Sequence, residues 1–201
     1  MATTQANTQN VPARNSKWLV KIIVEVTLIT IGVFLALMGE QWRESRHDRE
    51  LALSSLRGFR SEILANQKAV AAVKDYHVDL LARLHAYLKS DPKSRNSNSV
   101  RIAGLQPVFF ERTAWDLAMA TQSLAHIDQD LAFRLSRIYG LQRTYSESTQ
   151  GVMQAMYLRP LIETFDGLTA YYGDLVIWEP ELLKQYNEIL PLIDRALGEQ
   201  K

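Results

Sequence analysis

The segment IIVEVTLITIGVFLALM, residues 22–38, decides the architecture of this chain. It contains one ionisable residue, Glu25, and with the four residues before it the apolar run reaches the roughly 20 residues that a bilayer core requires. Trp18 and Trp42 bracket the run about 36 Å apart on a helix, which is typical of two interfacial anchors. The sequence therefore predicts a transmembrane helix over residues 18–38, with the lipid bilayer as its partner.

A cleaved signal peptide is the alternative interpretation of this segment. Arg14, Lys17 and Lys21 form a basic region directly ahead of the apolar run, as in a signal peptide. No small-x-small cleavage pattern follows, because the Ala-Leu-Met at residues 36–38 ends in a large side chain. This favours a retained anchor, in which Lys21 joins the two tryptophans as an interfacial residue.

The basic residues flanking the span barely discriminate between the two orientations. Three precede it, and Arg43, Arg46 and Arg49 follow it closely enough to influence the orientation of the span. The N-terminal tail, residues 1–17, carries no acidic residue and is similar to the start of a signal-anchor. We expect a flexible cytoplasmic tail, a single membrane span, and a C-terminal domain exported across the membrane.

Glu25 is the most informative residue of the span, because a carboxylate at mid-bilayer costs about 2.5–3.5 kcal/mol on insertion scales. One interpretation places it near an interface, paired with Lys21 one helical turn away. The other notes that Glu25, Gly32 and Gly39 recur every seven residues, with Ala36 four positions after Gly32. These four residues would form a helix-pairing face for a homodimer or for another membrane protein.

A long helix is predicted to follow the span over residues 40–88, because this stretch has no proline and carries a heptad pattern. The pattern predicts an apolar seam with 4-3 spacing: Ala52, Leu56, Phe59, Ile63, Asn66, Val70, Val73, His77, Leu80, Leu84 and Tyr87. Ser90-Asp91-Pro92 ends the helix, and a polar loop is expected over residues 89–106.

The seam needs a partner, which is either a second chain in a coiled coil or the later helices of the same chain. Packing within the chain is favoured, because further amphipathic segments follow. Asn66 and His77 are polar exceptions in the seam. They either set register and partner choice, or hydrogen-bond to a neighbouring helix or lie at the rim of the bundle.

Further helices are predicted within residues 107–199, and no segment shows convincing period-two alternation. The predicted helices are 107–124, 129–157 with Asp128 as N-cap, 160–173, and 180–197 with a kink at Pro191, while 174–178 is a buried connection. The fold class is therefore all-α: a transmembrane helix continuing into a long juxtamembrane helix, packed with three to four further helices as a bundle domain over residues 39–201.

The segment EVTLITIGVFLALMGEQWRESR, residues 25–46, resembles the N-terminal signature of DUF6090, a bacterial family of single-pass membrane proteins. The matching positions are Glu25, Gly32, Ala36, Leu37, Trp42, Glu44 and Arg46. Thr113-Ala114-Trp115 leading to Ser123-Leu124 is similar to a second pattern of that family, although Gln122-Ser123 stands where the family commonly has Gly-Asn or Gly-Asp. The resemblance implies a membrane-anchored helical domain in a bacterial inner membrane, so that the exported C-terminal domain would be periplasmic, and it supplies no catalytic residue.

Composition and motifs give no positive signal for chemistry. The net charge is +1 with interleaved signs, which argues against a nucleic-acid partner, and there is no cysteine. Of the histidines, His47, His77, His85 and His126, only His77 and His85 share a helix face, about 12 Å apart, which is too far for one metal ion. His126-x-Asp128-x-Asp130 suits a helix N-terminus better than a ligand set. We therefore expect no enzyme activity, no catalytic, cofactor-binding or metal-binding residue, and no cofactor.

The sequence thus predicts a non-enzymatic, membrane-anchored helical interaction, scaffold or sensory module. The alternative is a small-ligand-binding helical domain tethered to the membrane. That alternative needs a pocket among Trp115, Tyr171, Tyr172 and Trp178, although aromatic clusters more often fill cores.

Overall fold

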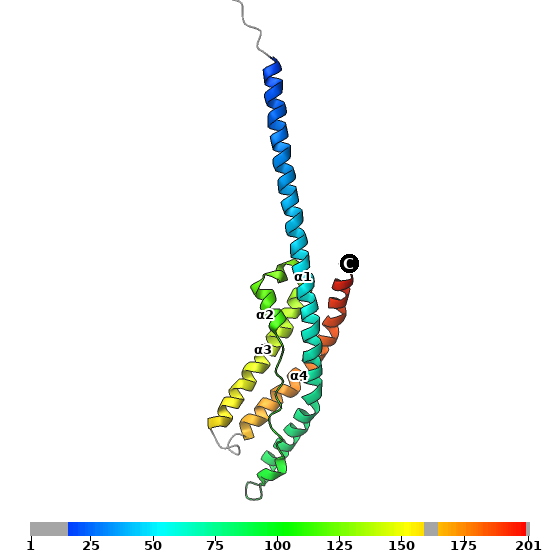
Figure 1. Cartoon of the computed structure of the whole chain (residues 1–201). Coiled ribbons are helices and arrows are strands. Elements are labelled where there is room, and N and C mark those ends of the chain that lie inside the picture. Colours follow the sequence, from blue (N-terminus) through cyan, green and yellow to red (C-terminus); the bar gives the residue numbers. More distant parts are fainter. Residues whose placement is uncertain (1–15, 159–164, 200–201) are drawn as a thin grey trace, which may run out of the picture. The chain divides into compact units, whose positions relative to one another are not determined.

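The computed structural model describes residues 16–158 and 165–199, and its regular elements in these ranges are all helices (Figure 1). The α-helices are α1 (Ser16–Lys89), α2 (Thr113–Ala120), α3 (Gln129–Leu158) and α4 (Phe165–Glu199), with short 3-10 helices η1 (Ser97–Val100) and η2 (Ser123–His126). The predicted all-α class is confirmed. The predicted helix over 40–88 is part of α1, which already begins at Ser16.

The chain divides into two compact units, Met1–His47 and Asp48–Lys201, which are described separately. Of the predicted tail over residues 1–17, the first fifteen lie outside the described residues. In the first unit every side chain from Trp18 to His47 is exposed. Its apolar window has a mean hydropathy of 2.4, and the helix is long and apolar enough to span a membrane. The second unit begins at Asp48, nine residues after the expected residue 39.

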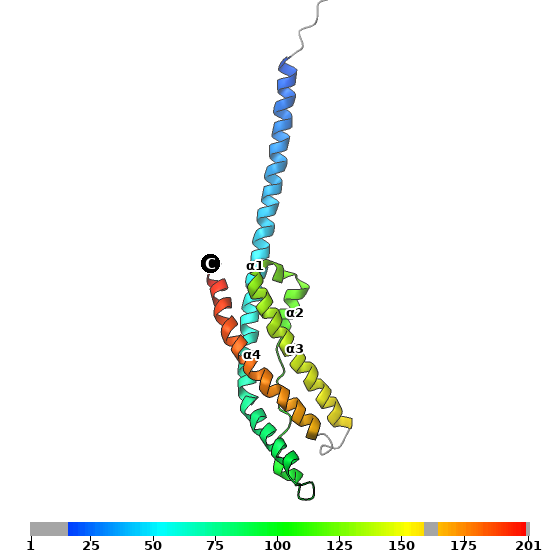
Figure 2. The ribbon, with the colours of Figure 1, turned by 180° about the vertical axis from the view of Figure 1, so that it is seen from behind.

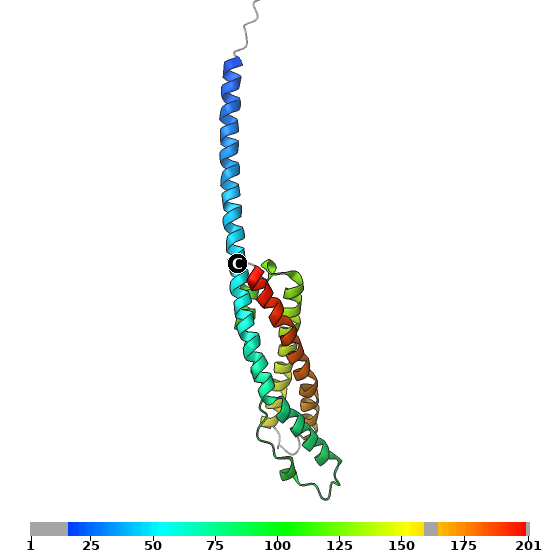
Figure 3. The same ribbon diagram turned by 90° about the vertical axis from the view of Figure 1, so that its right-hand side faces the viewer.

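Three helices form the body of the second unit: the part of α1 from Asp48 onward, α3 and α4 (Figure 2, Figure 3). Hydrogen bonds join Arg60 to Asp194 and His77 to Glu179, so residue numbers rise along α1 as they fall along α4. These two helices are therefore antiparallel. The contacts between α3 and α4 follow the same opposite order: Gln142 with Tyr186, Tyr145 with Glu179 and Thr149 with Tyr171.

The predicted seam of α1 forms one wall of the core. All of its eleven positions are buried except Val73 and Tyr87, which are half-buried. They pack against residues of α3 and α4, among them Leu135, Ile138 and Leu182. The later helices of the same chain therefore cover the seam, as expected, and no second chain is needed to bury it.

α4 is one continuous helix, so residues 165–173 and 180–197 are helical as predicted, whereas the predicted connection at 174–178 between two separate helices is wrong. The predicted start at Pro160 lies outside the described residues. Pro180 and Pro191 each remove a backbone donor, which suggested breaks in the sequence. Buried side chains on both sides of Pro180, such as Leu175 and Leu182, hold the helix together instead. α4 bends between its two ends (Figure 2).

The predicted helix 107–124 is also mostly wrong. Residues 101–112 have no helical structure, and α2 covers only Thr113–Ala120 before the turn at η2. The polar loop is therefore longer than the predicted 89–106. In contrast, α3 matches its prediction of 129–157 closely, and the Asp128 carboxylate accepts a hydrogen bond from the backbone N–H of Leu131 at 3.0 Å, as an N-cap does.

Candidate functional site

The extended 101–112 segment runs along α1 in the opposite direction, fixed by side chains rather than by secondary structure (Figure 1). Asn66 of α1 bonds to Glu111, and His77 of α1 bonds to Gln106. Eleven residues of helix rise about 16 Å, and five residues of extended chain span about 17 Å. The two lengths therefore match, which allows α1 to bind the segment at both points.

Asn66 binds the segment as a backbone partner would. Its Nδ2 donates to the carbonyl oxygen of Glu111 at 2.8 Å, and its Oδ1 accepts from the N–H of the same residue at 2.8 Å. The side chain is buried, so these two bonds satisfy both a buried amide and a backbone that has no strand partner. This explains the first polar exception in the seam.

His77 is the second polar exception, and both of its ring nitrogens have partners. Nε2 faces the carbonyl oxygens of Gln106 at 3.1 Å and Leu105 at 3.3 Å. Because carbonyls only accept, Nε2 carries a proton. Nδ1 lies 2.6 Å from Oε1 of Glu179, so one further proton lies between these two groups. The pair is then neutral overall, whether that proton belongs to the imidazole or to the carboxyl group.

Glu179 belongs to α4 and connects three elements. Its Oε1 also accepts a hydrogen bond from the hydroxyl of Tyr145 in α3 at 3.0 Å. Burial, followed by the proximity of Glu179, raises the pKa of the Tyr145 phenol well above its usual range, so this hydroxyl remains a donor. Neither Glu179 nor His77 has exposed side-chain surface. The second oxygen of Glu179 has no hydrogen-bond partner among the described residues.

Left-handed backbone at two positions brings successive carbonyls toward the bundle. Gly104 has φ 96° and Gln106 has φ 46°, and the second of these is uncommon for a residue with a side chain. Tyr76 donates to the Gly104 carbonyl at 2.6 Å, and Tyr172 donates to the Leu105 carbonyl at 3.0 Å. Three successive carbonyls of the segment therefore each have a side-chain donor.

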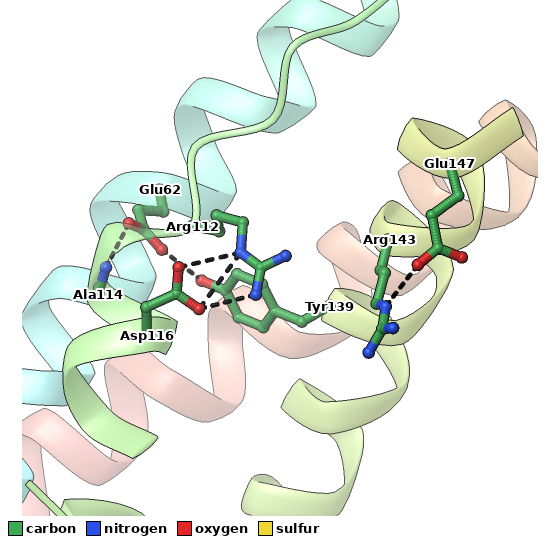
Figure 4. A network of polar contacts seen from close by, with 7 residues as sticks. All are labelled: Glu62, Arg112, Ala114, Asp116, Tyr139, Arg143 and Glu147. Carbon is green, nitrogen blue, oxygen red and sulfur yellow. Dashed lines mark hydrogen bonds and ion pairs between the residues drawn. The ribbon is translucent and has the colours of Figure 1, made fainter. Parts of the chain in front are cut away.

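Glu62 is a second buried carboxylate on α1, and it fixes the start of α2 (Figure 4). One of its oxygens accepts from the backbone N–H of Ala114 at 2.5 Å, and the other accepts from the hydroxyl of Tyr139 at 2.7 Å. Burial and this hydrogen bond raise the pKa of the Tyr139 phenol. A carboxylate at the first turn of a helix also interacts favourably with the helix dipole.

The polar cluster of His77, Glu179 and Tyr145 has the residue types of a catalytic site, but it is closed to solvent and to substrate. A substrate cannot reach groups with no exposed surface in this conformation. The other histidines lie apart: His47 and His85 are exposed, and His126 lies 3.6 Å from Asp48. In the part of the chain that the structure describes, no group of three or more potential ligands could hold a metal ion.

The residues predicted for the membrane segment are all exposed in the first unit. A Cβ added at Gly32 or Gly39 would meet no atom within 4 Å. Glu25 and Ala36 are exposed beside them, so the predicted pairing face is open. Lys21 is exposed as well, and its pairing with Glu25 stays a prediction.

The two interfacial tryptophans are exposed at either end of the apolar run. Trp18 is 64% exposed and Trp42 is 67% exposed. The guanidinium carbon of Arg46 lies 5.5 Å from the centre of the Trp42 ring, which places a cation over an aromatic face.

The aromatic residues predicted to line a ligand pocket instead fill the core. Tyr171 and Tyr172 are buried and in edge contact with each other at 5.1 Å between ring centres. Trp115 stacks on Tyr139 at 4.7 Å, and Trp178 packs 6.4 Å from Tyr145. The hypothesis of a pocket among these residues is corrected, because packing within the bundle occupies their rings.

No motif in the sequence marks Glu62, Tyr145 or Glu179 as part of a buried polar cluster. Glu179 lies between the predicted connection 174–178 and the helix predicted to start at Pro180, and Glu62 is adjacent to the seam, where an acidic residue usually faces water. Asn66 and His77 were the residues that indicated buried polar partners, because polar side chains in an apolar seam require hydrogen-bond partners in the core.

No family model matches this chain, and no curated protein and no solved structure matches it.

Proposed function

We propose that this chain is a non-enzymatic interaction or sensory module of the bacterial inner membrane, with its helical bundle on the periplasmic side. The observation that carries the proposal is the apolar N-terminal part of α1, whose side chains from Trp18 to Met38 are all exposed among the described residues of the first unit. In water the apolar side chains of this surface would be strongly unfavourable, whereas hydrocarbon would cover them favourably and leave Glu25 as the residue whose burial is costly. The resemblance of residues 25–46 to the DUF6090 signature supports the same architecture.

The absence of access to the buried polar cluster supports a binding role over catalysis. His77 and Glu179 connect α1, α4 and the 101–112 segment, and their hydrogen bonds are structural. A bundle held together in this way offers a stable exterior to a partner. Binding would then depend on the residues at the surface of the bundle, because the buried polar groups are used to hold the helices together.

The partner in the membrane is a second helix, from another copy of this chain or from another membrane protein. The open face of Glu25, Gly32, Ala36 and Gly39 allows close backbone approach, and Glu25 would be sheltered from lipid in the contact. Gly32→Ile is expected to reduce crosslinking of the full chain in native membranes with photo-reactive probes. Phe34→Ile is the matched control, because it lies about 200° around the helix from Gly32. Unchanged crosslinking in the Gly32 variant would contradict the pairing face.

The orientation can be tested directly, because the chain has no cysteine. Ser94 lies in the exposed loop after α1, so Ser94→Cys introduces one reactive thiol. A membrane-impermeant maleimide should label this thiol in intact spheroplasts if the bundle is periplasmic. Labelling only after lysis would place the bundle in the cytoplasm and overturn the localisation.

A groove on the bundle favours a second candidate function, the binding of a small uncharged ligand. It has a volume of about 380 Å³ and no charged side chain among its lining residues, which are Val108, Phe109, Ser146, Thr149, Gln150, Met153, Gln154 and Tyr157. This size suits a small molecule. A raised unfolding temperature of the full chain with an uncharged metabolite, lost in Met153→Glu, would support this function. A panel without any shift would contradict it.

A further inference from the structure

Two rows of side chains on α3 line the uncharged groove of the bundle. The residues of each row are four positions apart, so they follow one face of the helix: Ser146, Gln150 and Gln154 in the first row, and Thr149, Met153 and Tyr157 in the second. The other lining residues, Val108 and Phe109, belong to the 101–112 segment. From Ser146 to Tyr157 the helix rises about 16 Å, so the groove has room for an elongated ligand.

Gln150 and Gln154 carry side-chain amides that the bundle does not use. Both side chains are exposed, and neither has a hydrogen-bond partner among the residues that the structure describes. An amide offers both a donor and an acceptor, which complement the C=O and the N–H of a peptide backbone. The hydroxyls of Thr149 and Ser146, in contrast, are already hydrogen-bonded within the bundle. The two glutamine amides are therefore available to a ligand.

The bundle already holds one extended chain against a helix by means of a side-chain amide. Asn66 of α1 donates to the C=O of Glu111 and accepts from the N–H of the same residue, both at 2.8 Å. Along one edge of an extended chain such backbone groups recur about every 6.8 Å, and residues four apart on a helix rise about 6 Å. Gln150 and Gln154 can thus bind alternate residues of one extended chain, as Asn66 binds Glu111.

The side chains around the groove indicate which kind of chain would fit. No charged side chain is among the lining residues in the described part of the molecule. Phe109 is 75% exposed and Tyr157 is 85% exposed, although both are aromatic. Aromatic residues are enriched in protein–protein interfaces, whereas Lys, Glu and Asp are depleted there. An uncharged peptide would cover both rings without burying an unpaired charge.

We propose that this groove binds an extended, uncharged peptide segment of a partner protein. The amides of Gln150 and Gln154 pair with its backbone, and its side chains cover Phe109 and Tyr157. The proposal rests on the proposed function of the chain as an interaction module, and it names the chemistry of one partner. About five residues of the segment occupy the groove, because five extended residues span about 17 Å. Backbone hydrogen bonds then supply affinity, and the alternate side chains supply specificity.

Random peptides of uncharged residues, displayed on phage and selected on the full chain in detergent micelles, test the proposal. Selected peptides are synthesised with a fluorophore, and fluorescence anisotropy measures their binding. Gln150→Leu combined with Gln154→Leu should weaken binding at least about tenfold, because several hydrogen bonds are lost. Gln129→Leu is the matched control. It makes the same change at an exposed position of α3 outside the groove, so it should leave the affinity unchanged.

Methylation of the peptide nitrogens separates backbone recognition from side-chain packing. Methyl groups at alternate residues remove the donors of one edge of the extended chain. On the edge that faces Gln150 and Gln154 they should weaken binding about tenfold, and on the other edge they should have little effect. Peptides that bind the double variant as tightly as the unchanged protein, or that tolerate methylation on either edge, would overturn the proposal.

A failure of this proposal can be told apart from a failure of the proposed function. Crosslinking of the full chain in native membranes depends on Gly32 and the span, and not on the groove. Crosslinked neighbours without any selected peptide would overturn the peptide assignment and leave the proposed function intact. Neither crosslinked neighbours nor peptide binding would overturn both. Uncharged metabolites that raise the unfolding temperature, with no peptide bound, would make the groove a small-molecule site and also overturn the peptide assignment.

Discussion

His77 Nδ1 lies 2.6 Å from Glu179 Oε1, which joins two helices through residues 102 positions apart in the sequence. Neither side chain is exposed, so removing one partner leaves the other as a buried polar group without the contact that offset its burial. The second nitrogen of His77 faces the carbonyl oxygen of Gln106. The same contact therefore also holds the 101–112 segment against the bundle.

Replacing Glu179 with alanine is expected to destabilise the bundle by about 3–5 kcal/mol, the cost of leaving one partner of a buried pair alone. Glu179→Gln keeps the shape and a hydrogen-bonding group, so its loss should be smaller. His77→Ala combined with Glu179→Ala should cost less than the sum of the two, because both remove one contact. Thermal unfolding of the full chain in detergent micelles, followed by circular dichroism, measures these losses. Additive losses would show that the residues act independently.

Glu62 and the Arg143–Glu147 pair offer a matched comparison of a buried and an exposed carboxylate (Figure 4). Glu62→Ala leaves the N–H of Ala114 and the hydroxyl of Tyr139 without their acceptor, at about 1–3 kcal/mol each. Glu147→Ala breaks an ion pair whose side chains are 69% and 60% exposed, and should cost less than about 1 kcal/mol. Hydrogen exchange at Ala114 should accelerate in the first variant only. Equal stability losses in the Glu62 and Glu147 variants would contradict the role of Glu62 as a buried acceptor for Ala114 and Tyr139.

Gly58 of α1 lies where α2 approaches α1 closely. A Cβ at Gly58 would lie 2.8 Å from Cβ of Ala114, a distance that the two helices can accommodate only by moving apart. Gly58→Ala should therefore destabilise the bundle, despite the gain of about 1 kcal/mol that alanine brings to a helix interior. At Gly140 in α3 nothing lies within 4 Å, so Gly140→Ala should be stabilising. Unfolding temperatures that shift in the same direction would rule out the close approach at Gly58.

The long helix and its buried face could be predicted because both follow from local spacing. The 4-3 pattern from Ala52 to Tyr87 needs no knowledge of the rest of the chain, and α3 has a cap and a periodic apolar face. α4 could not be predicted as one helix, because the cost of Pro180 is local whereas the burial that offsets it is tertiary.

Only the residues that α1 contributes to the candidate site could be predicted from the sequence. Asn66 and His77 were visible as polar residues in an apolar seam, but their partners were not. Glu111 and Gln106 contribute backbone groups, which every residue has. Glu179 is distant in sequence, and without an alignment no pattern connects it to His77. The extended form of residues 101–112 was missed for the same reason, because the side chains that stabilise it belong to α1.

The buried tyrosines predict how the bundle responds to alkaline pH. Burial raises the pKa of Tyr139, Tyr145, Tyr171, Tyr172 and Tyr186 above the ordinary value of 10.0. Above that pH the unfolded chain loses phenolic protons that the folded chain keeps. The stabilisation is therefore complete below about pH 10 and falls as the pH rises further, by roughly 1.4 kcal/mol per pH unit for each such tyrosine.

Tyr186→Phe removes one of these phenols together with its hydrogen bond from Gln142, so it should make the alkaline loss of stability less steep. Tyr157→Phe is the control, because Tyr157 is 85% exposed and should leave the steepness unchanged. Phenolate absorbance and circular dichroism, recorded together during an alkaline titration in micelles, check the prediction. The phenolate signal of the buried tyrosines should appear only as the helices unfold, since a folded core has no room to hydrate a phenolate. A full phenolate signal with intact helices would show that these tyrosines are accessible to water.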